Sequence, residues 1–177
     1  IIIKEKVVDL WCYFFSHKLS PWTQAIHHAK SAVRFFSLEV GTYPYPQVTV
    51  VQCNRDGNDG MEYPMITLID KGFGDAGELE KLIVHEIGHN WFQGILSNNE
   101  RDEAWIDEGL VTYFENKYAR SKGIFNTLLS DAPLPLFSDY EQVIDFTSYI
   151  KSQRRNLRSA YNAPVNFSER DYVSSFY

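Results

Sequence analysis

The sequence lacks the marks of several protein classes. Only two of its 177 residues are cysteines, Cys12 and Cys53, and no C-x-x-C pair occurs. A structural zinc knuckle or a thioredoxin-like site is therefore unsupported, and the two thiols could be free or joined in one disulfide. No apolar run approaches the length of a transmembrane helix. The chain starts at Ile1 without a recognisable signal peptide, and a start without methionine leads us to expect an excised piece of a longer protein.

Positive charge is also scarce. The chain carries 17 Lys and Arg residues against 23 Asp and Glu residues, a net charge of −6. This balance gives no general basic footprint for nucleic acid, and we predict that the basic residues of 151–158 lie on a solvated helix face. Gly72, Gly74 and Gly77 do not form the G-x-G-x-x-G pattern of a phosphate-binding loop.

Apolar and aromatic residues, by contrast, are plentiful. The hydrophobic share is 44%, with 12 Phe, 11 Tyr and 4 Trp. This composition is sufficient for a packed core and argues against global disorder. The length suits one domain, which we take to span residues 1–177.

Residue patterns predict strands early in the chain and helices later. Runs of β-branched and aromatic residues predict strands within 1–20 and over 47–53 and 64–70, with a polar loop at 54–60. Apolar residues at three- and four-residue steps predict helices over 21–40, 78–94, 103–120 and 139–160, with a turn at 97–100 and a loop at 124–138. The expected fold class is α+β: a small sheet followed mainly by helices.

One stretch carries the chemistry. His85, Glu86 and His89 form the pattern H-E-x-x-H within the helix predicted over 78–94, and eighteen residues separate His89 from Glu108. Residues four apart share one helix face, so both imidazoles can hold one ion. Two histidines and one carboxylate leave a fourth position open, as in catalytic zinc sites. Glu86 then suits a general base acting on the water that the metal activates.

The alternative for this stretch is a surface helix that carries two histidines and a glutamate by chance. Against it, Glu108 lies on a second predicted helix, between apolar neighbours in W-I-D-E-G-L. A carboxylate buried there would need a compensating cation. Seven residues further on, Glu115 lies on the same helix face, and either Glu115 or Thr112 could orient a ligand imidazole; a solvated Glu115 is equally compatible with the sequence.

These residues also carry a resemblance. The segments H-E-I-G-H-N-W-F-Q-G and W-I-D-E-G-L-V-T-Y-F-E resemble the aminopeptidase N-like family of zinc aminopeptidases, gluzincins with a thermolysin-like catalytic domain. The family's second motif, G-x-M-E-N, is similar to N-D-G-M-E-Y-P at 58–64. The chain departs from the family at Tyr63, where Asn is usual, and at Asn90, where Gln is common.

The resemblance implies roles for residues around the metal. Glu62 would bind the free α-amino group of the substrate through a charge-assisted hydrogen bond. Gly60 and Met61 would place their backbone close to the substrate carbonyl, and 65–70 would be the edge strand along which a peptide pairs. In the family a tyrosine well downstream stabilises the oxyanion; Tyr177 is similar to it, with Tyr172 second.

The sequence thus predicts the catalytic domain of an aminopeptidase that uses one Zn²⁺ ion, held by His85, His89 and Glu108, and acts on peptides with a free N-terminus. The resemblance further implies that this domain packs against other domains of a longer protein. Two alternatives remain open: a gluzincin endopeptidase with the same ligands, and an inactive zinc-binding domain.

Overall fold

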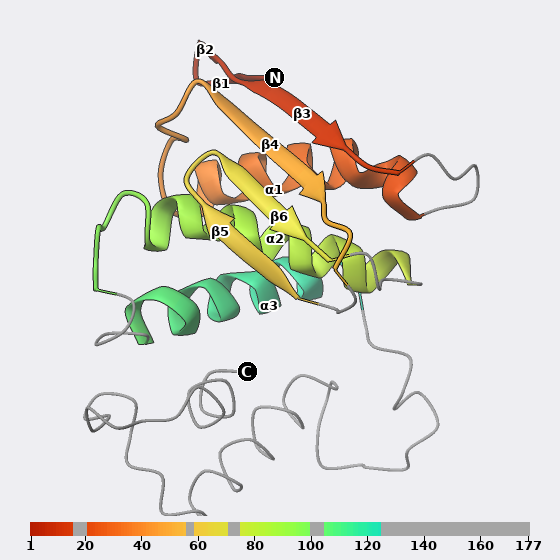
Figure 1. The fold of residues 1–177 in the computed structure, drawn as a ribbon. Helices are drawn as coiled ribbons and strands as arrows, with labels where there is room; N and C mark the ends of the chain where they lie inside the picture. The colour runs from red at the N-terminus through yellow and green to blue at the C-terminus, as the bar shows by residue number, and fades with distance from the viewer. Residues whose placement is uncertain (16–20, 56–58, 71–74, 100–104, 125–177) are drawn as a thin grey trace, which may run out of the picture.

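The computed structural model describes residues 1–15, 21–55, 59–70, 75–99 and 105–124. Within these ranges a four-stranded sheet is covered on one face by two helices, α1 and α2, with α3 beside α2 (Figure 1). The predicted helix over 139–160 and most of the predicted loop at 124–138 lie outside the described residues. None of the described helices is long and apolar enough to cross a membrane.

The sheet has the strand order β3-β4-β6-β5. Strands β3 (Asp9–Tyr13), β4 (Gln47–Gln52) and β6 (Ile66–Ile69) run parallel, and β5 (Gly60–Tyr63) pairs antiparallel with β6. Before the sheet, the predicted strand region 1–20 contains a small separate hairpin, β1 (Ile2–Ile3) with β2 (Lys6–Val7).

Two predictions about the sheet are wrong. Residues 60–63 form a strand, although Gly60 was expected to close a loop, and the edge strand beside the helices is β5 rather than 65–70, because β6 lies between β4 and β5. The hairpin joins Tyr63 to Ile66 through Pro64 and Met65, and Met65 has φ 66°. Proline followed by a residue with positive φ is the arrangement of a type II turn, which favours glycine at the second place.

The helices follow their predicted positions closely. A 3-10 turn (Pro21–Gln24) leads into α1 (Ala25–Glu39), and α2 (Ala76–Phe92) begins behind the N-cap Asp75, whose side chain accepts hydrogen bonds from the backbone N–H groups of Gly77 and Glu78. A π-helical turn (Trp105–Gly109) precedes α3 (Leu110–Lys122), which ends at Gly123 with φ 64°. A glycine in the left-handed region is the common helix end.

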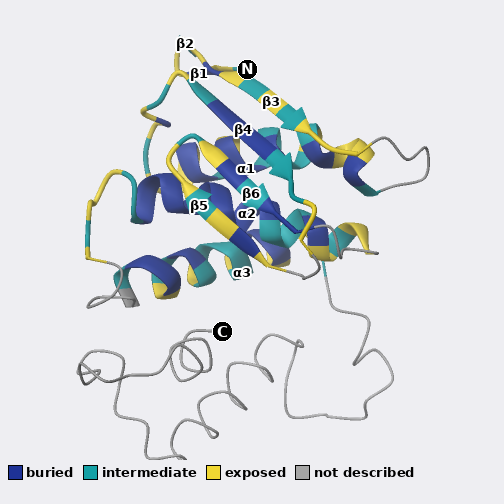
Figure 2. Cartoon of the chain, in the orientation of Figure 1, coloured by how far each residue is buried: buried dark blue, intermediate teal, exposed yellow. Residues whose placement is uncertain are grey.

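Helix α2 is the centre of the structure. Every residue of 83–92 is buried, and Figure 2 shows this part of α2 in the colour of buried residues, whereas the first turns are partly exposed. A helix buried on all sides belongs to the interior, since one apolar stripe suffices at a surface. Phe36 of α1 stacks on Trp91 with ring centroids 5.2 Å apart, and Gly88 lets α2 approach that ring closely. The residues of the H-E-x-x-H motif are therefore held in the best-packed element described.

Candidate metal centre

Three side chains converge between α2 and the start of α3. The ring nitrogens Nε2 of His85 and His89 lie 3.3 Å apart, and Glu108 Oε2 lies 3.1 Å from the first and 3.7 Å from the second. All three residues are at most 6% exposed. The structure thus brings together the three side chains predicted to hold the metal.

The spacing of these atoms fits a zinc ion. Ligands about 2.0–2.2 Å from a tetrahedral zinc lie about 3.3–3.6 Å from one another. The three separations in the structure, 3.1, 3.3 and 3.7 Å, lie within about 0.2 Å of that range. Two imidazole nitrogens and one carboxylate are also a donor set that suits zinc, with a fourth position left for water or substrate.

A carboxylate lies behind each imidazole. Nδ1 of His85 is 2.9 Å from Oε2 of Glu115, whose other oxygen is 3.4 Å from Nζ of Lys81. Nδ1 of His89 is 2.7 Å from Oδ1 of Asp107. Such partners would fix the tautomer that leaves each Nε2 able to bind a metal ion. Glu115 was one of two predicted partners; the other, Thr112, has no hydrogen-bond partner for its hydroxyl among the described residues.

Sequence reasoning missed the contribution of Asp107. Asp107 is 1% exposed and directly precedes Glu108. The carboxylate of Asp107 faces Nδ1 of His89, and that of Glu108 faces Nε2 of the same ring. Adjacent residues of a regular α-helix point in directions about 100° apart. The π-helical turn at Trp105–Gly109 is where both become directed at α2. The position of Asp107 directly before the predicted ligand Glu108 was the signal available in the sequence.

The carboxylates make the centre favourable for positive charge. Burial by itself lowers the pKa of His85, but the contacts with Glu108 and Glu115 outweigh it, so the pKa lies well above its usual value. The pKa of His89 is also raised, because the Asp107 carboxylate offsets the effect of burial. A metal ion at the two Nε2 atoms would displace only protons on those atoms, while the Nδ1 protons would stay with Glu115 and Asp107.

Glu86 lies beside the ligands but directs its carboxylate elsewhere. The residue is 3% exposed, and its Oε2 has no hydrogen-bond partner among the described residues. Burial raises its pKa to about 7, although the neighbouring histidines act in the opposite direction. A methyl group at Gly60 would come within 2.1 Å of Glu86 Oε1. The edge strand therefore passes directly over the carboxylate expected to act as the base.

Glu62, two residues along the same strand, is half-buried and reaches the same space. One of its carboxylate oxygens lies within 4.8 Å of atoms of Glu86 and His89. Burial raises the pKa of Glu62, and the negative charges of Glu108 and Asp107 raise it further, whereas His89 lowers it. Met61, by contrast, is exposed on the outer face of the sheet.

Asn90 connects the edge hairpin to α2. Its Oδ1 accepts hydrogen bonds from the backbone N–H of Met65 (2.9 Å) and from the hydroxyl of Tyr43 (3.3 Å), and its Nδ2 donates to the carbonyl of Ile87 (2.9 Å). The turn after Glu62 is thus bonded to the residue that follows a predicted ligand. Tyr172 and Tyr177, the predicted oxyanion donors, lie outside the described residues.

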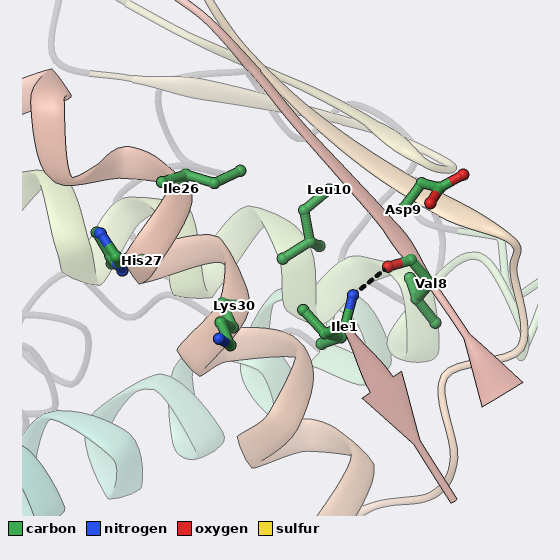
Figure 3. Close-up of a pocket in the computed structure, with 7 residues that line it drawn as sticks. All are labelled: Ile1, Val8, Asp9, Leu10, Ile26, His27 and Lys30. Atoms are coloured by element: carbon green, nitrogen blue, oxygen red, sulfur yellow. Dashed lines mark hydrogen bonds between the residues drawn. The ribbon is translucent and has the colours of Figure 1, made fainter. Parts of the chain in front are cut away.

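A separate hollow lies on another part of the molecule. Its volume is about 310 Å³, and it lies between β3 and α1 near the amino end, where the Ile1 amino group donates to the carbonyl of Val8 (Figure 3). Its lining includes Asp9, His27 and Lys30 but none of the converging side chains at the candidate metal centre. It therefore adds no residue to that centre.

A motif H-E-x-x-H on a buried helix, with a glutamate on the next helix and a sheet edge alongside, defines the catalytic-domain class of the gluzincin zinc metallopeptidases. The family model described as "Peptidase family M1 domain" matches residues 24–143. The chain belongs to peptidase family M1, which confirms the resemblance stated from the motifs.

Individual relatives agree with this assignment. Aminopeptidase Q of Acinonyx jubatus is 26% identical over 106 residues, which cover 50% of this chain and 11% of the relative. Aminopeptidase B of Homo sapiens is 35% identical over 60 residues, which cover 33% of this chain and 9% of the relative. The match to aminopeptidase Q thus spans 11% of that protein.

A solved structure shows the fold. The crystal structure of a mutant M1 zinc metallopeptidase from Deinococcus radiodurans superposes with a TM-score of 0.50 at 20% identity, over 71% of this chain and 25% of that one. The α+β zincin fold expected from the sequence is therefore confirmed.

Proposed function

We propose that this chain is the catalytic domain of a zinc-dependent aminopeptidase that removes the N-terminal residue of a peptide. The observation that carries the proposal is the position of Glu62: a carboxylate on the edge strand, with an oxygen within 4.8 Å of atoms of both Glu86 and His89. A carboxylate at that distance from the reacting atoms supplies what an exopeptidase needs, a fixed partner for a free α-ammonium group.

One zinc ion held by His85, His89 and Glu108 supports this function, and their separations of 3.1–3.7 Å favour it. When bound, zinc polarises the scissile carbonyl and lowers the pKa of a water molecule. Glu115 and Asp107 keep both imidazoles turned toward that position.

Glu86 is the proposed proton carrier. It takes a proton from the attacking water and delivers it to the amine that leaves. General base catalysis works best when the pKa of the base is near the working pH, and burial raises the pKa of Glu86 to about 7. Gly60 gives the base this position because a side chain there would occupy the same space.

The edge strand β5 orients the substrate. It has one neighbour in the described sheet, β6, so its outer backbone groups can pair with an extended peptide. Paired in this way, the peptide would pass Gly60 and end at Glu62. Tyr177, with Tyr172 second, stays a prediction for the donor to the oxyanion.

The first experiment replaces the base. Glu86→Gln should retain zinc, measured by elemental analysis, and lose about 10²–10⁴-fold in kcat with an aminoacyl p-nitroanilide, since the amide cannot accept the proton. The matched control is Glu78→Gln on the first, exposed turn of the same helix, which should keep full activity. Undiminished hydrolysis by Glu86→Gln would refute the mechanism.

A second comparison separates an aminopeptidase from an endopeptidase. The free aminoacyl substrate should be cleaved and its N-acetylated counterpart should not, because acetylation removes the charge that Glu62 binds. Equal cleavage of both would favour the endopeptidase alternative. Zinc binding without cleavage of either substrate would favour an inactive zinc-binding domain.

We further propose that residues 1–177 act within a longer protein. The small share of the relatives that the chain covers supports this, as does the outer face of the sheet, where Trp11, Tyr13 and Tyr63 are 51–57% exposed. Large aromatic groups exposed together are typical of an interface. In a longer protein, covalent labelling of these rings should fall; unchanged labelling would contradict this packing.

A further inference from the structure

Asp70 lies where the chain crosses the end of the sheet. Strand β4 ends at Gln52 and β5 begins at Gly60, and both residues pair with Ile69, the last residue of β6. Because β6 lies between β4 and β5, the connection between those two strands has to pass over the carboxyl end of β6. Asp70 directly follows that end. The residue is 4% exposed, so its carboxylate faces protein rather than solvent.

Asp70 binds both described ends of this connection. Its Oδ1 accepts a hydrogen bond from Nε of Arg55, 2.6 Å away and shortly after β4. Its backbone N–H donates to the carbonyl of Asp59, 2.9 Å away and directly before β5. A charge-assisted hydrogen bond as short as the first is a strong restraint. These two contacts, which we call the Asp70 clamp, fix where the chain enters β5.

The clamped end of β5 lies against the proposed base. Gly60 donates its backbone N–H to Oδ1 of Asp59 (2.9 Å), and a methyl group at Gly60 would come within 2.1 Å of Glu86 Oε1. Oε2 of Glu86 has no hydrogen-bond partner among the described residues, so the backbone of Gly60 limits how that carboxylate can turn. Reaction rates are sensitive to such placement, since an error of about 1 Å can cost about a hundredfold.

The other end of β5 is held by a different contact. Asn90 accepts a hydrogen bond from the backbone N–H of Met65 (2.9 Å) in the turn that leads to β6. Glu62, the proposed partner of the substrate amine, pairs with Thr67, one pair away from that turn. Loss of the Asp70 clamp should therefore displace Gly60 more than Glu62.

We propose that Asp70 is a positioning residue for hydrolysis, because it holds both ends of the β4–β5 connection and thereby keeps Gly60 beside Glu86. This inference rests on the proposed aminopeptidase function and adds to it a residue outside the metal centre. Loosening the clamp should slow the chemical step and leave the binding of zinc and of the substrate amine nearly unchanged.

The first test measures hydrolysis of an aminoacyl p-nitroanilide by the zinc-loaded chain. Asp70→Asn keeps the size of the side chain and removes the charge that Arg55 binds. Arg55→Met removes the other partner, whose side chain is 54% exposed, so the core stays intact. In both variants kcat should fall about tenfold and KM should change less than about twofold, as expected when an interaction matters only in the transition state. Zinc content should stay the same.

Amide hydrogen exchange tests the clamp without any cleavage. The amide of Asp70, bonded to the carbonyl of Asp59, should exchange about tenfold faster in Arg55→Met, because a local opening becomes easier. The amide of Cys53 donates to the carbonyl of Ile69 (2.7 Å) on the β4 side of β6 and should keep its rate.

Glu39→Gln is the matched control, since it removes an ion pair with Lys117 that joins α1 to α3, away from β5. It should alter neither kcat nor the exchange of Asp70.

An unchanged kcat in Asp70→Asn and Arg55→Met would overturn the inference, as would unchanged exchange at Asp70. Loss of zinc, or a rise in KM alone, would also overturn it, because the residue would then serve the metal or substrate binding. An unaltered chain that binds zinc and cleaves nothing would refute the proposed function, and hydrogen exchange alone would then decide whether the clamp exists.

Discussion

The hydrogen bonds of Asn90 should contribute strongly to stability. Asn90→Ala removes the acceptor for the Met65 backbone N–H and for the Tyr43 hydroxyl, and the donor to the Ile87 carbonyl. Tyr43 keeps a second acceptor, the carbonyl of Gln47, 3.0 Å away. The Met65 N–H is left without its acceptor, a loss of about 1–3 kcal/mol, and the other two bonds are worth about 1 kcal/mol each before relaxation.

The free energy of unfolding should therefore fall by about 2–4 kcal/mol, measured by urea denaturation. The control is Asn116→Ala on α3, half-buried and away from this network, where a change within about 0.5 kcal/mol is expected. A loss below about 1 kcal/mol for Asn90→Ala would refute the reasoning, because loss of three hydrogen bonds of a buried side chain should lower the free energy of unfolding by more than that.

A double-mutant cycle isolates one of these bonds. Tyr43→Phe removes the hydroxyl and leaves the packed ring in place. Combined with Asn90→Ala, the two changes should be less than additive by about 0.5 kcal/mol or more, since contacting residues couple and 3.3 Å is long for this bond. Full additivity would mean that the hydroxyl bonds only the carbonyl of Gln47.

Three further outcomes are expected. Glu115→Gln should weaken zinc binding about 10–100-fold in a chelator competition, because the partner of the His85 ring loses its charge; unchanged affinity would contradict that role. Burial and Glu80 raise the pKa of Tyr118, so its hydroxyl ionises at lower pH in the unfolded chain than in the folded one. The free energy of unfolding should therefore decrease as pH rises above about 10, and Tyr118→Phe should make this decrease smaller. Urea unfolding of both proteins at about pH 9 and about pH 11 measures this decrease, and an equal decrease in both would refute the reasoning. Removal of zinc by a chelator should lower the melting temperature by about 10 °C, with recovery on adding zinc, if zinc was present at about a thousand times its dissociation constant.

Sequence patterns were sufficient where many residues repeat the same signal. The apolar period of α2 located the H-E-x-x-H motif on a helix. Glu108 was identified because its apolar neighbours made an uncompensated carboxylate implausible. The M1 family and the zincin fold follow from the same residues.

Short elements stabilised from a distance were missed. Strand β5 has four residues, and its apolar side chains, Met61 and Tyr63, are exposed. It forms because β6 supplies its hydrogen bonds and Asn90 holds the turn. A polar loop was therefore expected up to Gly60. The π-helical turn is equally invisible to a 3.6-residue period, so Asp107 was taken only as a neighbour of Glu108.

The way in which Asp107 and Glu108 enclose one imidazole also limits how this chain can change its length. Within the turn, a deletion of one residue would redirect a carboxylate and leave one nitrogen of the His89 ring without its partner. Related chains should therefore keep a constant spacing inside this turn.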